Sequence, residues 1–418
     1  MHRVRQSLPY FKEFGWLAEV ITVDSEFIES YSIDNLLLET IPSNTIIHKV
    51  KAFSIKFTRK FGLGSLSIRS FLQIKSKGNE LLKNRHFDLI YFSTTAFHVM
   101  ALGPYWKRKF KVPFILDIQD PWRNDFYLNK PVSQRPPKFW FSYNLDKYLE
   151  KITIPNVDGI ISVSKDYNEV FQQRYPGLNS VVFKVIPFAG SEIDFKIVEN
   201  HNIVSEQIKF NPDQINVVYI GRGGHDMEFA LSIFFSALAH GLEANPLLFK
   251  KIHCWFIGTS YAAQGFGKKT IQPVAETFGV ENHVSEISDR LPYFETLALL
   301  QKADFLFVPG STDKAYTASK IYPYILAKKP ILGIFHQNSS VVEIINATNS
   351  GSVVSFEEND ELEILTAKVY DTLSNILTKI PFVPDTNWEA FKPYTAREMT
   401  LKQCDFFDSV LNGNNSFQ

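Results

Sequence analysis

A short segment in the second half of the chain carries residue types suited to binding an anion. Ser319 and Lys320 follow an apolar run at 304–308 and a loop at 309–313, and a second apolar run follows at 330–335. This order predicts a strand, a loop, the start of a helix and another strand, an arrangement that binds nucleotides at the carboxyl ends of its strands. The free N–H groups of a helix beginning near Ser319, with the Lys320 ammonium beside them, would favour a phosphate.

A glycine-rich turn is the second candidate for phosphate binding. The apolar run at 215–220 predicts a strand, and the sequence Gly-Arg-Gly-Gly follows it. Glycines let the backbone approach a phosphate closely, and a guanidinium can bind phosphate through two hydrogen bonds. The alternative is that Arg222 pairs with a carboxylate and the glycines only turn the chain. The candidate phosphate-binding residues are Gly221, Arg222, Gly223, Gly224, Ser311, Ser319 and Lys320.

Two further side chains are candidates for acid–base chemistry. Asp120 follows a predicted strand at 114–118 and would lie at the carboxyl-end rim of a sheet, where a carboxylate can accept a proton or hold hydroxyl groups. The alternative is that Asp120 caps the next turn or pairs with Arg123. His98 follows the loop at 93–95, and the alternative for this histidine is a structural role.

The start of the chain is basic and has an unusual order of elements. The apolar spacing predicts a helix over 2–16 that ends at Gly15, and then a buried strand at 18–23. His2, Arg3 and Arg5 would bind a phosphate of a substrate, or would simply lie on an exposed helix start. A doubly wound domain normally begins with a strand and a glycine-rich turn. We therefore expect either a late start of the reading frame or the loss of the first strand.

Length, charge and cysteine content narrow the possible functions. A chain of 418 residues predicts two domains, each with its own core. The 44 basic and 44 acidic residues balance, which argues against a nucleic-acid partner. Cys254 and Cys404 lack the spacing of metal ligands, so we expect neither a metal nor another cofactor. Because the sequence has no apolar run of about 20 residues and no apolar leader, it predicts a soluble, cytoplasmic protein.

Near-continuous apolar strands alternate with helical segments through the chain. This pattern predicts an α/β protein with parallel sheets covered on both faces. The pattern stops and restarts once, so we expect a first domain at 1–190, a polar and irregular hinge at 191–214, and a second domain at 215–395 that faces the first across a cleft. A C-terminal helix at 396–418 is expected to pack back on the first domain.

Several of these segments together resemble the motifs of GT-B glycosyltransferases of the family-four type. The segment 319–332 resembles their donor-binding motif S-K-x-x-E-Y-x-A-x-G-K-P, and 117–122 looks like D-x-R-D-P-W. The segment 157–164 is similar to V-D-x-I-x-x-V-S, and 2–5 is similar to the H-R-x-R that follows the glycine loop of the family. The resemblance implies the GT-B fold, with two Rossmann-like domains, a nucleotide-sugar donor on the second domain and an acceptor on the first.

The resemblance also implies roles for single residues. The arginine that matches Arg222 contacts the donor diphosphate, a lysine that assists it has no match here, and Lys320 is the remaining cation. Asp120 and His98 would be catalytic, and His2, Arg3 and Arg5 would bind the acceptor. Pro323 replaces the glutamate that contacts the donor ribose, and Ala315 replaces the other acid of that motif. Tyr322, Tyr324 and Ser319 could offer hydroxyls instead, with core packing as the alternative for the tyrosines.

The implied activity is transfer of a sugar from a nucleotide-sugar to a glycan or lipid-linked acceptor in the synthesis of a cell-surface polysaccharide. A catalytically silent GT-B scaffold or regulator is the alternative from another class, because both acids of the motif are absent. A sugar-nucleotide epimerase with the same fold is a third possibility.

One basic stretch of the predicted first domain suits a membrane surface. From Lys49 to Lys77 the sequence contains no acid, and phenylalanines are interleaved with the cations. The cations are Lys49, Lys51, Lys56, Arg59, Lys60, Arg69, Lys75 and Lys77. Basic and apolar side chains together favour an anionic membrane, which would place the protein on the inner face of the cell membrane. A solvated basic face with buried aromatic rings is the alternative.

Overall fold

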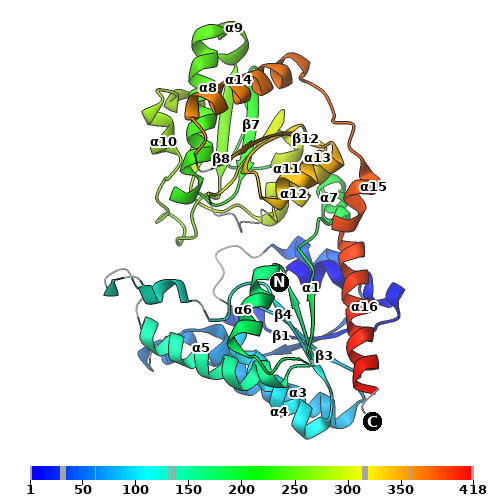
Figure 1. Cartoon of the computed structure of the whole chain (residues 1–418). Coiled ribbons are helices and arrows are strands. Elements are labelled where there is room, and N and C mark those ends of the chain that lie inside the picture. Colours follow the sequence, from blue (N-terminus) through cyan, green and yellow to red (C-terminus); the bar gives the residue numbers. More distant parts are fainter. Residues whose placement is uncertain are drawn as a thin grey trace. The chain divides into compact units, whose positions relative to one another are not determined.

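The protein divides into two compact units of parallel strands and helices, shown in a computed structural model (Figure 1). The first unit comprises Met1–Ser30, Ile41–Phe188 and Arg397–Gln418, and the second comprises Tyr31–Thr40 and Ala189–Ala396. The expected α/β class is confirmed. The structure describes residues 2–28, 34–61, 63–123, 125–129, 131–132, 135, 138–179, 181–312, 319–357 and 359–415.

Four parallel strands form the main sheet of the first unit, in the same order as in the sequence. They are β3 (Ile90–Ser93), β4 (Phe114–Ile118), β5 (Gly159–Ser162) and β6 (Val182–Val185). Every residue of β4 is buried, as its continuous apolar sequence predicts. The connecting helices are η5 (Phe97–Ala101), a 3₁₀ helix, with α4 (Leu102–Phe110), α5 (Phe139–Thr153) and α6 (Lys165–Arg174).

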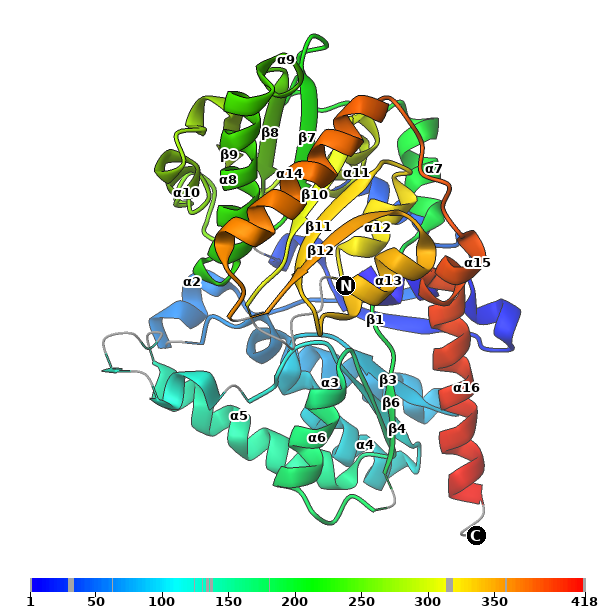
Figure 2. The same ribbon diagram turned by 45° about the horizontal axis from the view of Figure 1, so that its top comes forward.

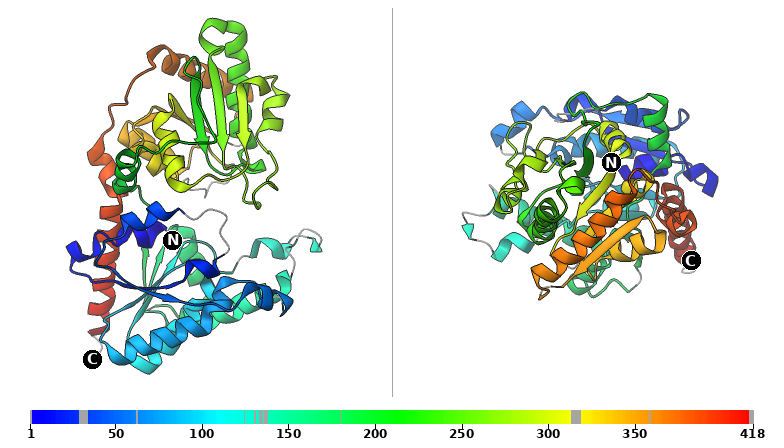
Figure 3. Two further views of the ribbon diagram at one scale, coloured as in Figure 1. Left: turned by 180° about the vertical axis from the view of Figure 1, so that it is seen from behind. Right: turned by 90° about the horizontal axis from the view of Figure 1, so that it is seen from above.

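A separate pair of parallel strands, β1 (Glu19–Val23) and β2 (Ile46–Val50), lies on the first unit against α3 (Leu66–Asn84) (Figure 3). The strand predicted at 18–23 is therefore present, but the expectation that it is buried is wrong. All five residues of β1 are only half-buried, because β1 pairs with β2 alone and is not an inner strand of the four-stranded sheet.

The N-terminal helix is shorter than the sequence pattern predicts. It consists of α1 (His2–Ser7), followed by the 3₁₀ helix η1 (Phe11–Phe14), which ends at the left-handed Gly15 with φ 83°. Pro9 explains the interruption, because proline lacks a backbone N–H and its ring clashes with the preceding helical turn. Within the first unit, α16 (Ala396–Asn415) packs beside this segment, and the Phe407 ring lies 5.2 Å from that of Trp16.

The second unit contains a six-stranded parallel sheet in the order β12-β11-β10-β7-β8-β9. The strands are β7 (Ile215–Ile220), β8 (Ile252–Ile257), β9 (Val284–Ile287), β10 (Phe305–Pro309), β11 (Ile331–His336) and β12 (Gly351–Phe356). The chain runs outward from β7 to β9 and then returns to add β10 on the other side of β7. The order therefore reverses between β7 and β10, and such a reversal is where open α/β sheets bind ligands.

Helices cover both faces of the six-stranded sheet. On one side α8 (Glu228–Ala244) and α14 (Leu362–Lys379) lie next to each other (Figure 2). The remaining helices of eight or more residues in the described part of this unit are α7 (Glu192–Asn200), α11 (Tyr293–Lys302) and α13 (Ser340–Thr348). The short α10 (Gln272–Thr277) and α12 (Ile321–Leu326) follow loops at the carboxyl ends of the strands.

The segment predicted to be irregular, 191–214, contains the helix α7. Ser191 caps it by accepting a hydrogen bond from the Asp194 N–H at 3.4 Å, and its buried face includes Phe195 and Val198. Tyr293 donates a 2.7 Å hydrogen bond to the Asp194 carboxylate and ties α7 to α11. The sequence analysis missed this helix because its apolar residues alternate with charged ones over a short stretch and so do not show helical spacing. A hinge function of this segment stays a prediction.

A buried ion pair joins α1 to the carboxyl end of β4. Arg3 Nε lies 3.1 Å from Asp117 Oδ2, and both side chains are fully buried. Arg3 Nη2 also donates to the Ile186 carbonyl at 2.7 Å, just after β6. Ser93 and Gln119 donate to the same Asp117 oxygen at 2.5 and 2.7 Å. This pair therefore holds together three segments that are distant in the sequence.

We predict that Arg3→Met lowers the free energy of unfolding by about 3–5 kcal/mol, because it leaves the Asp117 carboxylate buried without its counter-ion. Urea denaturation measures the change. Arg3→Met/Asp117→Asn should recover most of the loss. The matched control is Arg397→Met, which removes a half-exposed pair with Glu13 and should cost less than about 1 kcal/mol. Equal losses in Arg3→Met and Arg397→Met would contradict the assignment of Arg3 as the counter-ion of a buried carboxylate.

Candidate functional site

The strand reversal in the second unit brings two loops together at the carboxyl end of the sheet. β10 pairs with β7, so the loop after Pro309 lies beside the turn Gly221 to Gly224. The two loops are bonded directly, since the Thr312 N–H donates to the Asp226 carbonyl at 2.9 Å. The structure thus places most of the predicted phosphate-binding residues together at the carboxyl end of the sheet.

The glycines of this turn are required by close packing. A Cβ atom on Gly221 would lie 2.3 Å from Tyr219 Oη and 2.7 Å from Lys320 Nζ. A Cβ atom on Gly223 would lie 2.3 Å from Thr270 Oγ1. Tyr219 also donates a 2.9 Å hydrogen bond to the Arg222 carbonyl. The turn is therefore compact and braced, and a side chain larger than hydrogen at these positions would displace the lysine or the neighbouring loop.

Arg222 forms a bidentate ion pair with a carboxylate four residues further on. Its Nη1 and Nη2 lie 2.8 and 2.5 Å from the two oxygens of Asp226. The hydrogen bonds from Arg222 are the main reason that the pKa of Asp226 falls to about 2, and a hydrogen bond from Ser311 contributes. The pairing considered as an alternative in the sequence is present. A phosphate that binds this guanidinium would share it with Asp226.

Lys320 carries a positive charge that the described residues leave without a carboxylate partner. Burial of its ammonium, followed by the charges of Arg290 and Arg222, lowers its pKa to about 8. Within the described ranges, neither Lys320 nor Arg290 forms an ion pair with an acid. A bound anion would relieve this repulsion, because an opposite charge nearby favours the protonated amine.

Arg290 is a site residue that the sequence analysis missed. It follows β9, and its guanidinium lies over the Tyr261 ring, 4.0 Å from the centroid. The sequence of β9, Val-Ser-Glu-Ile, is half polar, so it does not mark a strand end in the way that the apolar runs do. The only sequence signal was a cation in the loop between two predicted elements, and many exposed cations share that signal.

The buried carboxylate of Glu286 organises the loop beside the glycine turn. Thr259 donates to it at 2.6 Å, and so do three successive backbone N–H groups at 2.7–3.0 Å. Those N–H groups belong to Thr270, Ile271 and Gln272. Because the Gly223 N–H donates to the Thr259 carbonyl at 2.8 Å, this strand residue fixes the position of the turn through the loop.

The helix expected near Ser319 begins two residues later, as α12, and has only six residues. Pro323 lies in its first turn, where the missing N–H costs little. Tyr324 is buried, and its hydroxyl accepts from the Ile220 N–H at 2.7 Å. Tyr322 is also buried and stacks on Tyr394. These contacts favour the core-packing alternative for both tyrosines. Ser319 lies in the turn before α12, and the replaced acid position at 315 lies outside the described residues.

Asp120 lies just beyond β4 in the first unit and is exposed. Partial burial of its carboxylate raises its pKa above the ordinary value. It does not pair with Arg123, since Arg123 binds Asp125 at 3.1 Å. A carboxylate that keeps its proton more firmly and has no ion-pair partner among the described residues suits general base or acceptor-binding chemistry.

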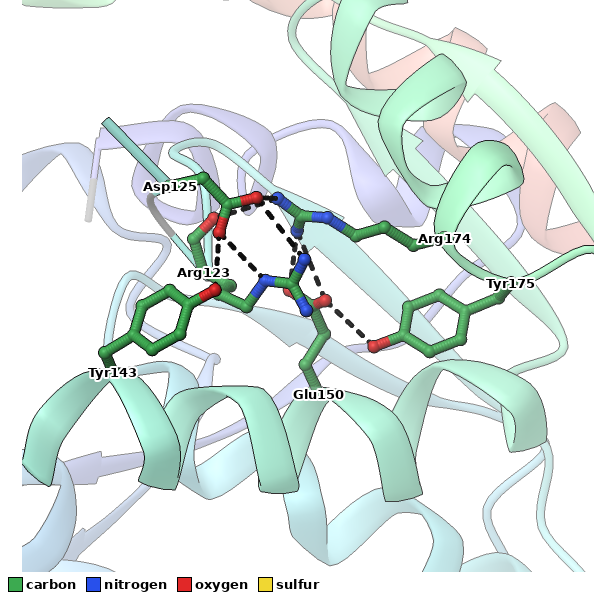
Figure 4. Close-up of polar contacts among 6 residues, drawn as sticks. All are labelled: Arg123, Asp125, Tyr143, Glu150, Arg174 and Tyr175. Atoms are coloured by element: carbon green, nitrogen blue, oxygen red, sulfur yellow. Dashed lines mark hydrogen bonds and ion pairs between the residues drawn. The ribbon is translucent and has the colours of Figure 1, made fainter. Parts of the chain in front are cut away.

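A polar network anchors the loop that follows Asp120 (Figure 4). Arg174 bridges two carboxylates, Asp125 at 2.6 Å and the buried Glu150 at 3.2 Å. Desolvation raises the pKa of Glu150, and this effect outweighs the charge of Arg174. The network consists of Arg123, Asp125, Tyr143, Glu150, Arg174 and Tyr175. It ties the loop to α5 and α6.

His98 is held on both sides of its ring. Ser67 Oγ lies 2.5 Å from Nδ1, and Asp146 Oδ1 lies 3.3 Å from Nε2. These partners belong to α3 and α5, so they favour the structural alternative. The neighbouring Phe97 stacks on Trp122 at 5.9 Å and so places η5 beside the loop of Asp120. A catalytic role for His98 stays a prediction.

The three N-terminal candidates occupy different environments. Arg3 and Arg5 are buried, whereas His2 is exposed. The alternative of an exposed helix start is therefore wrong for the two arginines, because Arg3 pairs with Asp117 and Arg5 Nη2 lies 3.2 Å from His2 Nδ1. Binding of an acceptor phosphate by Arg3 would compete with its buried ion pair.

Neither a metal-binding cluster nor a membrane-spanning helix is present among the described residues. Among the described residues there is no group of three or more His, Cys, Asp or Glu side chains that could hold a metal ion. In the same residues, no helix has the length and apolar character needed to cross a membrane.

Comparison with known proteins identifies the fold. No family model matches the chain, and no curated protein matches it. Among solved structures, sucrose-phosphate synthase from Thermosynechococcus elongatus is similar, with a TM-score of 0.57 and 12% identity over 98% of this chain and 92% of that one. HepE of Anabaena, in complex with UDP and glucose, gives a TM-score of 0.54 and 15% identity over 97% and 94%.

A UDP-forming α,α-trehalose-phosphate synthase from Burkholderia xenovorans gives a TM-score of 0.53 and 12% identity over 95% of this chain and 99% of the other. At such identities the likeness shows the fold alone. The structural neighbours are glycosyltransferases, and the chain has their GT-B fold with two Rossmann-like domains.

Proposed function

We propose that the protein is a metal-independent glycosyltransferase that moves a sugar from a nucleotide-sugar to a glycan or lipid-linked acceptor. The observation that carries the proposal is the carboxyl end of the six-stranded sheet, where Arg222, Arg290 and Lys320 lie near one another beside a glycine turn. A nucleoside diphosphate that leaves a sugar gains negative charge, and preorganised cations stabilise that charge. HepE of Anabaena, which is similar in fold, was crystallised with UDP and with UDP-glucose.

The role proposed for each residue follows from the chemistry of its side chain. Lys320 and Arg290 neutralise the diphosphate, and the N–H group of Gly224 contacts one of its oxygens. Asp120 takes the proton of the acceptor hydroxyl or holds that hydroxyl. Because Pro323 offers no carboxylate, the donor ribose is held without the acid found in the related motif.

The proposed setting is the cytoplasmic face of the cell membrane, in the synthesis of a cell-surface polysaccharide. Within the basic stretch from Lys49 to Lys77, Arg69 is buried and donates to the carbonyls of Phe53 and Phe27. Phe53 and Phe57 are exposed, as are the cations Lys51, Lys56, Arg59 and Lys60. We therefore narrow the proposed contact with an anionic membrane to 51–60.

A silent scaffold or regulator of glycan assembly is the second candidate. The Arg222–Asp226 pair favours it, because a carboxylate of the chain itself already neutralises the guanidinium. Substitution of the ribose-binding acid by Pro323 points the same way. The desolvated charge of Lys320, which has no carboxylate partner among the described residues, favours the enzyme, since a scaffold gains nothing from keeping a desolvated cation.

The test of donor binding is calorimetry with UDP and GDP. We expect one of them to bind, and Arg222→Ala and Lys320→Ala each to weaken binding by at least about 1 kcal/mol, roughly fivefold in Kd, through lost charge-assisted hydrogen bonds. Lys302→Ala is the matched control, because Lys302 is an exposed lysine at the end of α11. Unchanged affinity in both site variants would overturn the assignment of Arg222 and Lys320 to the diphosphate-binding site.

The pH dependence of nucleotide binding tests Lys320 specifically. Its pKa of about 8 in the free protein means that it is charged below that pH and loses its charge as the pH rises through 8. Affinity for the diphosphate should therefore fall between about pH 7.5 and 9.5, by up to roughly tenfold. Lys320→Arg keeps its charge throughout and should give a nearly flat profile. Parallel profiles for the two proteins would rule out Lys320 as the titrating group.

Release of nucleoside diphosphate from nucleotide-sugars, measured with and without lipid-linked acceptor extract, tests catalysis. We expect release that needs the acceptor, and a fall of roughly 100-fold in Asp120→Asn if the carboxylate is the general base. Asp166→Asn, at an exposed acid of α6, should retain full activity. Donor binding without release would support the scaffold, and epimer formation without acceptor would identify an epimerase.

A further inference from the structure

A hollow of about 220 Å³ lies at the amino ends of β11 and β12 in the second unit. Part of its lining comes from Pro330, Ile331 and Gly351, where the two strands begin side by side. The rest comes mainly from the end of α14 and from the loop that leads to α15 (Trp388–Phe391) (Figure 1). Because the strands are parallel, Lys320 and Arg222 lie at the opposite end of the sheet. The hollow is therefore separate from the proposed donor site.

The loop that lines the hollow is bonded to the end of α13. Asn349, the left-handed residue with φ 49° that ends α13, donates from Nδ2 to the Asp385 carbonyl at 2.9 Å. The Asn387 N–H donates to the Thr348 carbonyl at 2.8 Å. Pro384 further restricts the loop, because its ring fixes φ. The hollow is thus shaped by contacts within the chain, as most small-molecule sites are.

Four polar side chains line the hollow and form neither a hydrogen bond nor an ion pair within the described residues. They are Ser352, Asn375, Lys379 and Asp385. An ammonium only donates and a carboxylate only accepts, whereas a hydroxyl and an amide do both. A ligand that satisfies all four side chains must therefore both donate and accept, as adjacent hydroxyl groups do. A phosphate accepts, and its charge would be repelled by Asp385.

The apolar lining and the size of the hollow narrow the ligand further. Ile376, Phe382 and Pro384 provide apolar contact beside the polar groups, which suits the C–H face of a sugar ring. The volume is below the range of about 300–1,000 Å³ that is typical of sites for drug-sized ligands. The hollow therefore fits a single ring and is too small for a nucleotide-sugar.

We propose that this hollow is a non-catalytic binding site for one pyranose unit of a neutral glycan. The hydroxyl groups of the sugar bond to Asn375, Lys379 and Asp385, and its C–H face packs on Phe382. The opposite charges of Lys379 and Asp385 leave the site without net charge, which favours a neutral sugar over an acidic one.

This inference goes beyond the proposed transfer reaction, because sugar binding at the amino ends of the strands does not involve the donor site. One consequence does rest on the proposed function. If the chain elongates a glycan, a product held through one of its sugar units stays attached to the enzyme, which raises its effective concentration as the next acceptor.

Saturation-transfer NMR of the full chain with the methyl glycosides of glucose, galactose, mannose and N-acetylglucosamine tests the proposal. We expect at least one glycoside to bind, and Lys379→Ala/Asp385→Ala to weaken its binding roughly tenfold or more, because two charged hydrogen-bonding groups are lost. Ser352→Phe fills the hollow and should abolish binding. The matched control is Lys368→Ala/Asp371→Ala, which removes the same two charges from exposed positions of α14 and should bind as the wild type does.

Three results would overturn the proposal. They are absence of binding by all four glycosides, equal binding by the wild type and both site variants, and binding of inorganic phosphate that Lys379→Ala/Asp385→Ala abolishes while no glycoside binds. Circular dichroism of each variant checks folding. Calorimetry with UDP and GDP on the same proteins separates the two proposals, since glycoside binding at the hollow without nucleotide binding would support this site and contradict the proposed function.

Discussion

The second unit carries excess positive charge at the carboxyl end of its six-stranded sheet. The donor site proposed for this unit depends on that charge. Lys320 is partly desolvated and lies near Arg290 and Arg222, and only Arg222 has a carboxylate partner among the described residues. Folding alone does not favour such an arrangement, because a desolvated cation beside like charges is destabilising. Other features of the unit act to keep it in place, including the reversed strand order and the buried Glu286 that holds the adjoining loop.

In the first unit, buried ion pairs hold the exposed carboxylate of Asp120 in a fixed position. The Arg3–Asp117 pair fixes the end of β4, directly before the loop of Asp120. The network around Arg174 then ties that loop to α5. The buried ion pairs in this unit are better explained as positioning devices than as sources of stability, since burying charges has a large desolvation cost.

The sequence predicted the parts of this structure that local pattern controls. The strands at 114–118 and 215–220 have the expected bounds, because continuous apolar runs between turn residues leave little ambiguity. The proximity of Arg222 and Lys320 followed from the position of each after a strand. The rest depends on tertiary contacts. Neither the partner of Arg3 nor the location of Arg290 is visible in local sequence.

A crystal structure of the protein with the nucleoside diphosphate that binds it most tightly is the most direct test of the central claim. The account predicts that the diphosphate lies at the carboxyl ends of β7 and β10, with its oxygens within about 3 Å of Lys320 Nζ and of the Gly224 N–H group. Arg222 should then contact a phosphate oxygen in addition to, or in place of, Asp226. A nucleotide bound elsewhere, with the Arg222–Asp226 pair unchanged and no phosphate at the carboxyl ends of β7 and β10, would contradict this prediction.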